Sequence, residues 1–377
     1  MIDAEFQGWL RELAGPGGSD LYVTVNAPPA WRGGSGFRNL RDKPLTVEEI
    51  NRIFSSFLNE KQRKEFDTTG EFNMALMMEG VGRFRLNLFK QRQMPGIVAR
   101  IIRAEIPTLA QLKLPSLFGD LVMEKRGLIF VVGGTGSGKS TTLAAMIGHR
   151  NETAPGHIIT IEDPVEYVHD HKKCIVTQRE VGVDTDSFDA ALKNTLRQHP
   201  DLILIGEIRD MKTMEHAINI AETGHLAMAT LHANNANQAI ERVTNFFPIE
   251  MHHQILLNLS LNLRGIISQR LVAKKEGGRA AALEIMLNQG YIKELIGKGE
   301  IKELKKVMEE NAHNGMQTFD QALLKLFQEG TINEETALAE ADNVGDLKLK
   351  IKQANIASSG KGGGGLKDVD TSKLSLG

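Results

Sequence analysis

The chain of 377 residues contains a single cysteine, Cys174, so it can form neither an intrachain disulfide nor a cysteine-rich zinc site. Cys174 is therefore interpreted as a small apolar strand residue of a protein in a reducing compartment. The N-terminal residues lack the basic and apolar regions of a signal peptide, and no apolar run approaches the roughly 18 residues of a membrane span. These absences predict a cytoplasmic protein with no direct membrane insertion.

A marked excess of charge of either sign is also lacking. The sequence has 45 Lys and Arg against 47 Asp and Glu, for a formal net charge of -2. This balance argues against nucleic acid as the main partner, although a local basic channel would not show in the sum. With 41% hydrophobic and 24% charged residues, the composition is typical of a globular protein, and the length favours two domains.

Proline and glycine indicate where the N-terminal domain ends. Residues 1–103 combine helical and strand-like patterns, with turns predicted in the Gly/Pro-rich stretch 27–36, and they are predicted to form a small α+β domain. Pro107 and Pro115 restrict the backbone that follows. We therefore assign residues 104–120 as a linker.

Residues 121–353 are predicted to form a second, larger domain. From Gly127 onward, apolar strands alternate with helical patterns, which indicates an α/β sheet with a parallel core. The part from about residue 234 onward is predicted to be mostly helical, and Thr318 and Gln321 form a capping box at the start of its clearest helix. Residues 354–377 are rich in Gly and Ser and are predicted to be a flexible tail.

The stretch "GGTGSGKST" matches the phosphate-binding pattern G-x-x-x-x-G-K-[ST] and lies between a predicted strand and a predicted helix. Its glycines let backbone N–H groups curve around an anion, and the helix N-terminus adds a favourable dipole. Lys139 would reach the β and γ phosphates of ATP, and the Ser140 hydroxyl would ligate Mg²⁺. A mere glycine turn would not explain these two residues at these positions. The predicted nucleotide-binding residues are Gly133, Gly134, Thr135, Gly136, Ser137, Gly138, Lys139, Ser140 and Thr141.

Two predicted strands end in carboxylates. In "DLILIGE", Gly206 occupies the place where a phosphate-loop protein usually has an Asp that supports Mg²⁺, and Glu207 follows it. Glu162 ends another strand, in "TIEDPVEY". One such carboxylate can hold the water ligands of magnesium while the other orients the attacking water, so the pair suits metal-assisted hydrolysis. The alternative for both residues is a solvated loop acid.

His225 and His232 bracket a further predicted strand. They would lie about 23 Å apart if it were fully extended, so they are poor partners in one metal site. One of them, for which we choose His232, could sense the γ phosphate. A capping or core histidine is at least as consistent with the sequence alone.

The stretch "GRFRLNLFKQR" alternates with period two, so Arg83 and Arg85 share one face of a predicted strand with Asn87. From Arg83 to Arg103 there are six basic residues and no acid. These arginines could form a solvated strand face. Alternatively, they could reach the nucleotide of an adjacent subunit, as arginine fingers do.

Four stretches in this order resemble the Walker A, Asp-box, Walker B and His-box elements of the type II/IV secretion-superfamily ATPases. They are "GGTGSGKST", "IITIEDPVEY", "LRQHPDLILIGEIRD" and "GHLAMATLHANNANQAIERV". The N-terminal "GGSDLYVTVNAPPAWR" and "GRFRLNLFKQR" are similar to the PAS-like domain of the pilus-retraction branch, the PilT/PilU family. The resemblance covers roughly residues 5 to 350. A C-terminal "AIRNLIRE" motif, present in part of this branch, is missing, which favours the accessory retraction ATPases.

The resemblance implies a fold and an assembly. It implies a RecA-like phosphate-loop core of the α/β class, a smaller α+β PAS-like N-terminal domain, a helical C-terminal region and a homohexamer. It implies ATP hydrolysis with Mg²⁺ that drives type IV pilus retraction at the cytoplasmic face of the inner membrane. A PilT-type companion ATPase and the inner-membrane platform protein of the pilus would be the partners.

The resemblance also assigns roles to the candidate residues. Glu207 matches the catalytic glutamate, Glu162 belongs to the Asp box, and His225 and His232 belong to the His box. Arg83 and Arg85 match the basic strand of the N-terminal domain. Two other functions are compatible with the same motifs: a regulatory nucleotide-binding subunit that hydrolyses little ATP, and a DNA-translocating ATPase.

Overall fold

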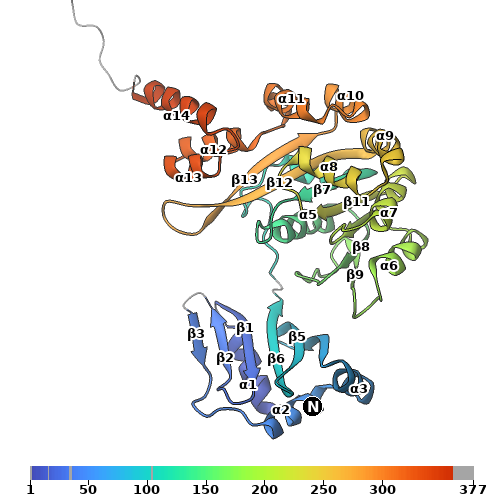
Figure 1. The fold of residues 1–377 in the computed structure, drawn as a ribbon, viewed down its shortest axis with the longest axis vertical. Helices are drawn as coiled ribbons and strands as arrows, with labels where there is room; N and C mark the ends of the chain where they lie inside the picture. The colour runs from blue at the N-terminus through green and yellow to red at the C-terminus, as the bar shows by residue number, and fades with distance from the viewer. Residues whose placement is uncertain (1, 16, 34–35, 103–104, 360–377) are drawn as a thin grey trace, which may run out of the picture. The chain divides into compact units, whose positions relative to one another are not determined.

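A six-stranded antiparallel sheet organises the N-terminal part of the chain, in the order β3-β2-β1-β6-β5-β4 (Figure 1). The computed structural model describes residues 2–15, 17–33, 36–102 and 105–359. The strands of this sheet are β1 (Gly18–Thr24), β2 (Ala30–Gly33), β3 (Gly36–Asn39), β4 (Glu71–Met78), β5 (Gly82–Gln91) and β6 (Met94–Ile102).

Strand β5 shows how the sequence pattern builds this sheet. Phe84, Leu86 and Leu88 are fully buried in the hydrophobic core, whereas Arg83 and Arg85 alternate with them and lie on the other face. The same core contains buried side chains of the three helices of this part. These are α1 (Ala4–Leu13), α2 (Val47–Phe57) and α3 (Glu60–Thr69).

Part of the stretch in which turns were predicted forms a strand. Within residues 27–36, Ala30–Gly33 is β2, which pairs with β1 and β3. Residues 34 and 35 lie outside the described residues. A strand of four residues is too short to show a periodicity among so many glycines and prolines.

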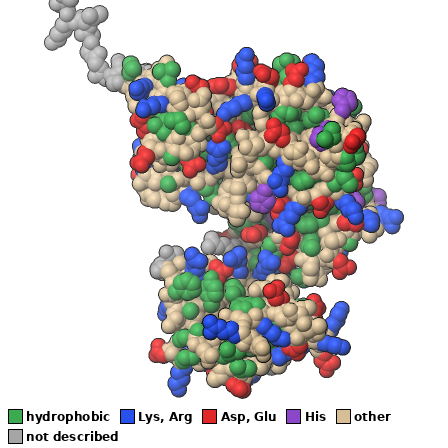
Figure 2. Space-filling view, viewed as in Figure 1, with side chains coloured by type: hydrophobic (Ala, Val, Ile, Leu, Met, Phe, Trp, Pro, Cys, Tyr) green, Lys and Arg blue, Asp and Glu red, His purple; other side chains and the backbone are tan. Residues whose placement is uncertain are grey.

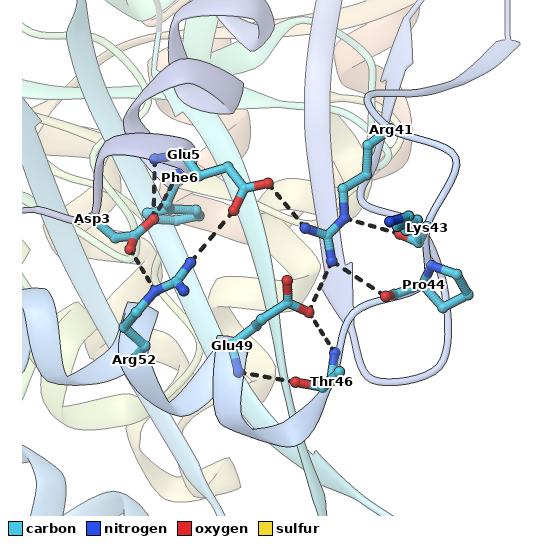
Figure 3. Close-up of polar contacts among 9 residues, drawn as sticks. All are labelled: Asp3, Glu5, Phe6, Arg41, Lys43, Pro44, Thr46, Glu49 and Arg52. Atoms are coloured by element: carbon cyan, nitrogen blue, oxygen red, sulfur yellow. Dashed lines mark hydrogen bonds and ion pairs between the residues drawn. The ribbon is translucent and has the colours of Figure 1, made fainter.

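Ion pairs of two arginines connect the first helix of the chain to the second. Arg41 Nη1 lies 2.9 Å from Glu5 Oε1 on α1, and its Nη2 lies 2.8 Å from Glu49 Oε2 on α2 (Figure 3). Arg52 Nε lies 2.9 Å from Asp3 Oδ2, the residue that caps α1 (Figure 3). Because several charges share these contacts, the network fixes the helices relative to each other better than an isolated surface pair would.

A seven-stranded sheet, in the order β13-β12-β7-β11-β10-β8-β9, forms the centre of the larger part. The pairs β8–β9, β8–β10 and β10–β11 are parallel, and β12–β13 is antiparallel. This confirms the predicted α/β class with a parallel core. The strands are β7 (Gly127–Val132), β8 (Gly156–Glu162), β9 (Cys174–Glu180), β10 (Leu202–Ile205), β11 (Leu226–Leu231), β12 (Leu263–Ala273) and β13 (Arg279–Leu287).

Side-chain caps mark the start of helices in the larger part. Ser187 caps α6, and Thr318 and Gln321 form the predicted capping box of α12. The helices are α4 (Leu117–Val122), α5 (Lys139–Thr153), α6 (Phe188–Thr195), α7 (Met211–Glu222), α8 (Ala236–Asn245), α9 (His252–Asn262), α10 (Tyr291–Lys298), α11 (Leu304–Glu310), α12 (Phe319–Gln328), α13 (Glu334–Ala339) and α14 (Val344–Ser359).

The prediction of a mostly helical region from residue 234 onward holds except for one hairpin. Strands β12 and β13 span 11 and 9 residues and pair along their length. Apolar residues run through β12 without a clear period, so periodicity alone could not separate a strand from a buried helix there. Helix α14 continues to Ser359, past the predicted start of the tail, and the rest of the tail lies outside the described residues.

Contacts divide the chain into two compact units, one from the described residues of 1–129 and 140–230 and one from those of 130–139 and 231–377. In the part of the chain that the structure describes, no helix is long and apolar enough to cross a membrane. Acidic and basic side chains are interspersed over the face of the molecule drawn in Figure 2.

Candidate active site

The phosphate loop begins where β7 ends at Val132 and leads into α5 at Lys139. Gly133, Gly136 and Gly138 have φ angles of 153°, 76° and 89°, which favour glycine over any residue with a side chain. At Gly136 a Cβ would meet nothing within 4 Å, so it is the backbone conformation that favours glycine there.

Strand β12 supports the loop from the other side. The buried Gln269 donates from Nε2 to the backbone oxygen of Ser137 at 2.8 Å. A Cβ on Gly133 would lie 2.4 Å from the backbone oxygen of Gln269, and a Cβ on Gly138 would lie 2.7 Å from the side-chain Nε2 of Gln269. Gly133 is therefore needed because the backbone of β12 packs so closely, a contact that the motif alone could not reveal.

The polar groups of the loop suit a phosphate. Lys139 Nζ donates to the backbone oxygens of Gly133 and Gly134 at 2.7 and 2.9 Å, which holds the ammonium group over the loop. The Ser137 hydroxyl is buried and makes no hydrogen bond to the described residues. A cation and an unsatisfied buried hydroxyl on a glycine loop fit the phosphates of a nucleotide. Among the described residues, no group of three or more His, Cys, Asp or Glu side chains could hold a metal ion.

Glu162 and Glu207 lie at the same edge of the sheet. Glu162 ends β8 and Glu207 follows β10, and these neighbouring strands are parallel, with Ile205 opposite Ile161. Hydrogen bonds fix the backbone on both sides of Glu207. The Gly206 N–H donates to Ile161 at 2.7 Å, and the Ile208 N–H donates to Thr230 of β11 at 2.9 Å.

The close approach of β8 explains why a glycine precedes Glu207. A Cβ on Gly206 would lie 3.0 Å from Glu162 Cα and 3.1 Å from the Ile161 oxygen. A side chain at this position, an aspartate included, would need β8 to shift by a few tenths of an ångström. Glycine fits without such a shift, and the acid of this strand is Glu207, one residue later.

The Glu207 side chain is 16% exposed and is paired with Arg209, whose Nη2 lies 2.7 Å from Glu207 Oε2. Arg209 Nη1 also lies 4.0 Å from Asp163 Oδ2. These three residues line a pocket of about 280 Å³ in front of the N-terminal ends of α6 and α7. Sequence reasoning did not identify Arg209, although it stands two residues after the predicted acid.

Glu162 is held by its neighbours on β8 and β9. Its Oε1 accepts from Thr160 Oγ1 at 2.7 Å and from Gln178 Nε2 at 3.2 Å. Burial raises the pKa of Glu162 above its ordinary value, and these hydrogen bonds only partly oppose the shift. A carboxyl with a raised pKa beside another acid is typical of an active site.

The raised pKa of Glu162 predicts a gain in stability when its charge is removed. The folded state binds the proton of the Glu162 carboxyl more tightly than the unfolded chain does. The contribution of this carboxyl to the free energy of unfolding therefore falls as pH rises through the folded pKa. Glu162→Gln should therefore raise the melting temperature at neutral pH. The difference should shrink as pH falls through the raised folded pKa toward the ordinary pKa of a glutamate, and it should stay constant below that value. Melting curves of both proteins across pH would contradict this prediction if the difference stayed constant.

A buried carboxylate that the sequence did not single out, Glu180, ends β9 opposite Glu162. Its Oε2 accepts from the Val165 N–H at 3.2 Å and lies 3.4 Å from Nη2 of the predicted site residue Arg83. Arg83 therefore contacts an acid of its own chain. Arg85 stands opposite Arg100 in the register of β5 and β6.

The two predicted histidines lie at opposite ends of β11. His225 precedes the strand, where its Nδ1 is 3.2 Å from Thr223 Oγ1 and its backbone oxygen accepts from Gly127. His232 follows the strand, at the end where parallel strands carry ligand-binding residues, and is exposed. Only His232 is thus placed at the carboxyl end of its strand.

One further contact connects two of the motifs. Thr141 Oγ1, on the first turn of α5, lies 2.9 Å from the hydroxyl of Tyr167. Tyr167 belongs to the segment that follows Glu162. The start of the phosphate-loop helix and the Asp-box segment are therefore in direct contact.

Comparisons with known proteins identify relatives along nearly the whole chain. Residues 97–337 match the family described as "Type II/IV secretion system protein". The chain is 52% identical over 349 residues to "Type IV pilus ATPase PilU" of Pseudomonas aeruginosa, covering 92% of this chain and 91% of that protein. It is 41% identical over 325 residues to "Type IV pilus retractation ATPase PilT" of the same organism, covering 86% of this chain and 94% of that protein.

A solved structure shows the same fold. The crystal structure of the pilus retraction motor PilT with bound ADP matches with a TM-score of 0.85 and 42% sequence identity, and the match covers 93% of this chain and 99% of that one. The predicted α/β core with an N-terminal α+β part and C-terminal helices is therefore confirmed.

Proposed function

Because the chain belongs to the type II/IV secretion system protein family, in the branch of the pilus ATPases PilT and PilU, we propose that Gly133–Thr141, Glu162 and Glu207 form its ATPase site. The chain is an ATPase of type IV pilus retraction and binds nucleotide. The observation that carries the site assignment is the pair of acids on adjacent parallel strands, in a chain with a complete phosphate loop.

Each residue of the site has a distinct role in this proposal. The loop N–H groups and Lys139 bind the phosphates. The Ser140 hydroxyl would hold Mg²⁺, and that ion would supply positive charge beside the phosphates. Glu207 orients the attacking water and accepts its proton. The backbone bonds of Gly206 and Ile208 to β8 and β11 hold Glu207 in position for this role. Glu162 would hold the metal from the end of β8 by accepting hydrogen bonds from its bound waters. His232 contacts the γ phosphate from the end of β11.

The proposed motor is a homohexamer in which Arg83 and Arg85 reach the nucleotide of a neighbouring subunit. Nucleotide would bind closed and open subunits with different affinity. Closure on binding and reopening after hydrolysis would then rotate one domain against the other. By its similarity to PilU, we assign the chain as an accessory retraction ATPase that works with a PilT-type companion. Its proposed place is the inner-membrane face of the pilus machine, against the platform protein.

One experiment tests this function directly. With ATP and Mg²⁺, the purified chain should have the mass of a hexamer and should hydrolyse ATP. Lys139→Ala should weaken nucleotide binding, because it removes the ammonium group held over the loop and leaves the glycines in place. A monomer without turnover would overturn the motor. Unchanged ATP affinity in the variant would show that the phosphate-loop assignment is wrong.

A further inference from the structure

A second buried carboxylate lies outside the residues assigned so far. Glu284, on β13, is 3% exposed, and burial raises its pKa above the ordinary value. Its Oε1 accepts two hydrogen bonds, from the Ala236 N–H at 2.8 Å and from Ser268 Oγ at 3.1 Å. Burial of a carboxylate costs free energy, so the position of Glu284 in the interior needs a physical reason.

The first of these bonds acts on the turn that carries His232. Strand β11 ends at Leu231 and α8 begins at Ala236, so the connection 232–235 is short. At the helix end, Asn235 accepts from the Gln238 N–H at 2.9 Å. The bond from Ala236 to Glu284 adds a buried anchor at the same point, because an acid accepts well from the unpaired N–H groups of a helix N-terminus.

The second bond joins Glu284 to β12, the strand that also supports the phosphate loop. Ser268 precedes Gln269 on β12, and successive side chains of a strand point to opposite faces. Ser268 therefore contacts Glu284 on one face, while Gln269 contacts the loop residue Ser137 on the other. The contact with the phosphate loop is therefore made by a different residue, from the opposite face of β12.

From these contacts we infer that Glu284 is a positioning residue, which holds the turn bearing His232 in place by accepting the Ala236 N–H. Glu284 contacts Ala236 and Ser268, and it acts on turnover only through the turn that bears His232. The inference rests on the proposed function, in which His232 contacts the γ phosphate.

The test removes the hydrogen-bond acceptor with and without the histidine. Glu284→Leu should lower kcat by about 10- to 10²-fold, the scale of a misplacement near 1 Å. Affinity for a fluorescent ADP should not change, because the loop contact is made by Gln269 and Glu284 does not bond to that residue. Glu284→Gln keeps an Oε1 acceptor and should restore most of the turnover. In a His232→Ala background, Glu284→Leu should lower kcat no further.

A variant of the donor covers the case in which Glu284→Leu fails to fold. Ala236 is the first residue of α8, a position that accepts proline, and Asn235 before it is extended, with φ of -157°. Ala236→Pro removes the N–H without breaking the helix. It should lower kcat as Glu284→Leu does, again only when His232 is present.

The outcomes separate the inference from the proposed function. Equal losses in both backgrounds, or a normal kcat in Ala236→Pro, would overturn the role of Glu284 and leave the ATPase assignment standing. A normal kcat in His232→Ala would have the same consequence. A wild-type chain without turnover would overturn both.

Discussion

Glu207→Gln should lower ATP turnover by about 10²-fold or more while nucleotide affinity stays unchanged, because positioned acid–base chemistry contributes about that much. Glutamine keeps the shape of the side chain but cannot accept a proton from the attacking water. The backbone bonds of Gly206 and Ile208 to the neighbouring strands do not depend on the side chain, so the fold should be preserved. Single-turnover hydrolysis, with nucleotide affinity measured separately, checks both parts.

The matched control for this substitution is Glu215→Gln, an exposed glutamate on α7, which should leave turnover unchanged. Glu162→Gln provides the comparison that assigns the roles. If it lowers turnover more than Glu207→Gln does, then Glu162 is the base and Glu207 holds the metal waters.

The second large effect concerns the arginines of β5. Arg83→Ala together with Arg85→Ala should abolish most turnover, since arginine fingers supplied by a partner contribute roughly 10³ to 10⁵ in rate in GTPases. Rings that mix this double variant with Lys139→Ala subunits should recover activity that neither variant shows alone. Such rings contain some sites with an intact phosphate loop from one chain and intact arginines from the next.

The mixing experiment needs proof of subunit exchange, for which two differently labelled chains suffice. Arg38→Ala, which changes an exposed arginine on β3, is the control that should keep full activity. If exchange is demonstrated and activity stays at the mutant level at every ratio, the arginines act within their own chain. The ion pair between Arg83 and Glu180 is the contact that would then account for the loss.

Much of the fold could be predicted because its local signals are strong. The phosphate loop, the apolar strands β8 and β10 and the capping box at Thr318 each depend on a few neighbouring residues. The alternation of Phe84, Leu86 and Leu88 with arginines likewise predicted which face of β5 is buried. The acids at two strand ends could be placed together because parallel strands end at one edge of a sheet.

What the sequence could not supply is contact between distant segments. Gln269 is far from the phosphate loop along the chain, and nothing in its neighbourhood marks it as a support for Ser137. Glu180 and Glu284 stand among ordinary strand residues, and only their burial shows that they are unusual. Strands β12 and β13 were missed for a related reason, because their apolar runs become strands only through pairing.

The dependence of the phosphate loop on β12 has a consequence for any attempt to reduce the protein to a minimal fragment. A chain cut before Leu263 would retain every residue of the motif and both acids, yet it would lack the strand whose Gln269 bonds to Ser137 and lies close to Gly133 and Gly138. Those glycines would then face solvent and sample many backbone conformations instead of one. The smallest piece able to hold a nucleotide is thus defined by packing and extends through the hairpin, well beyond the last motif that can be read in the sequence.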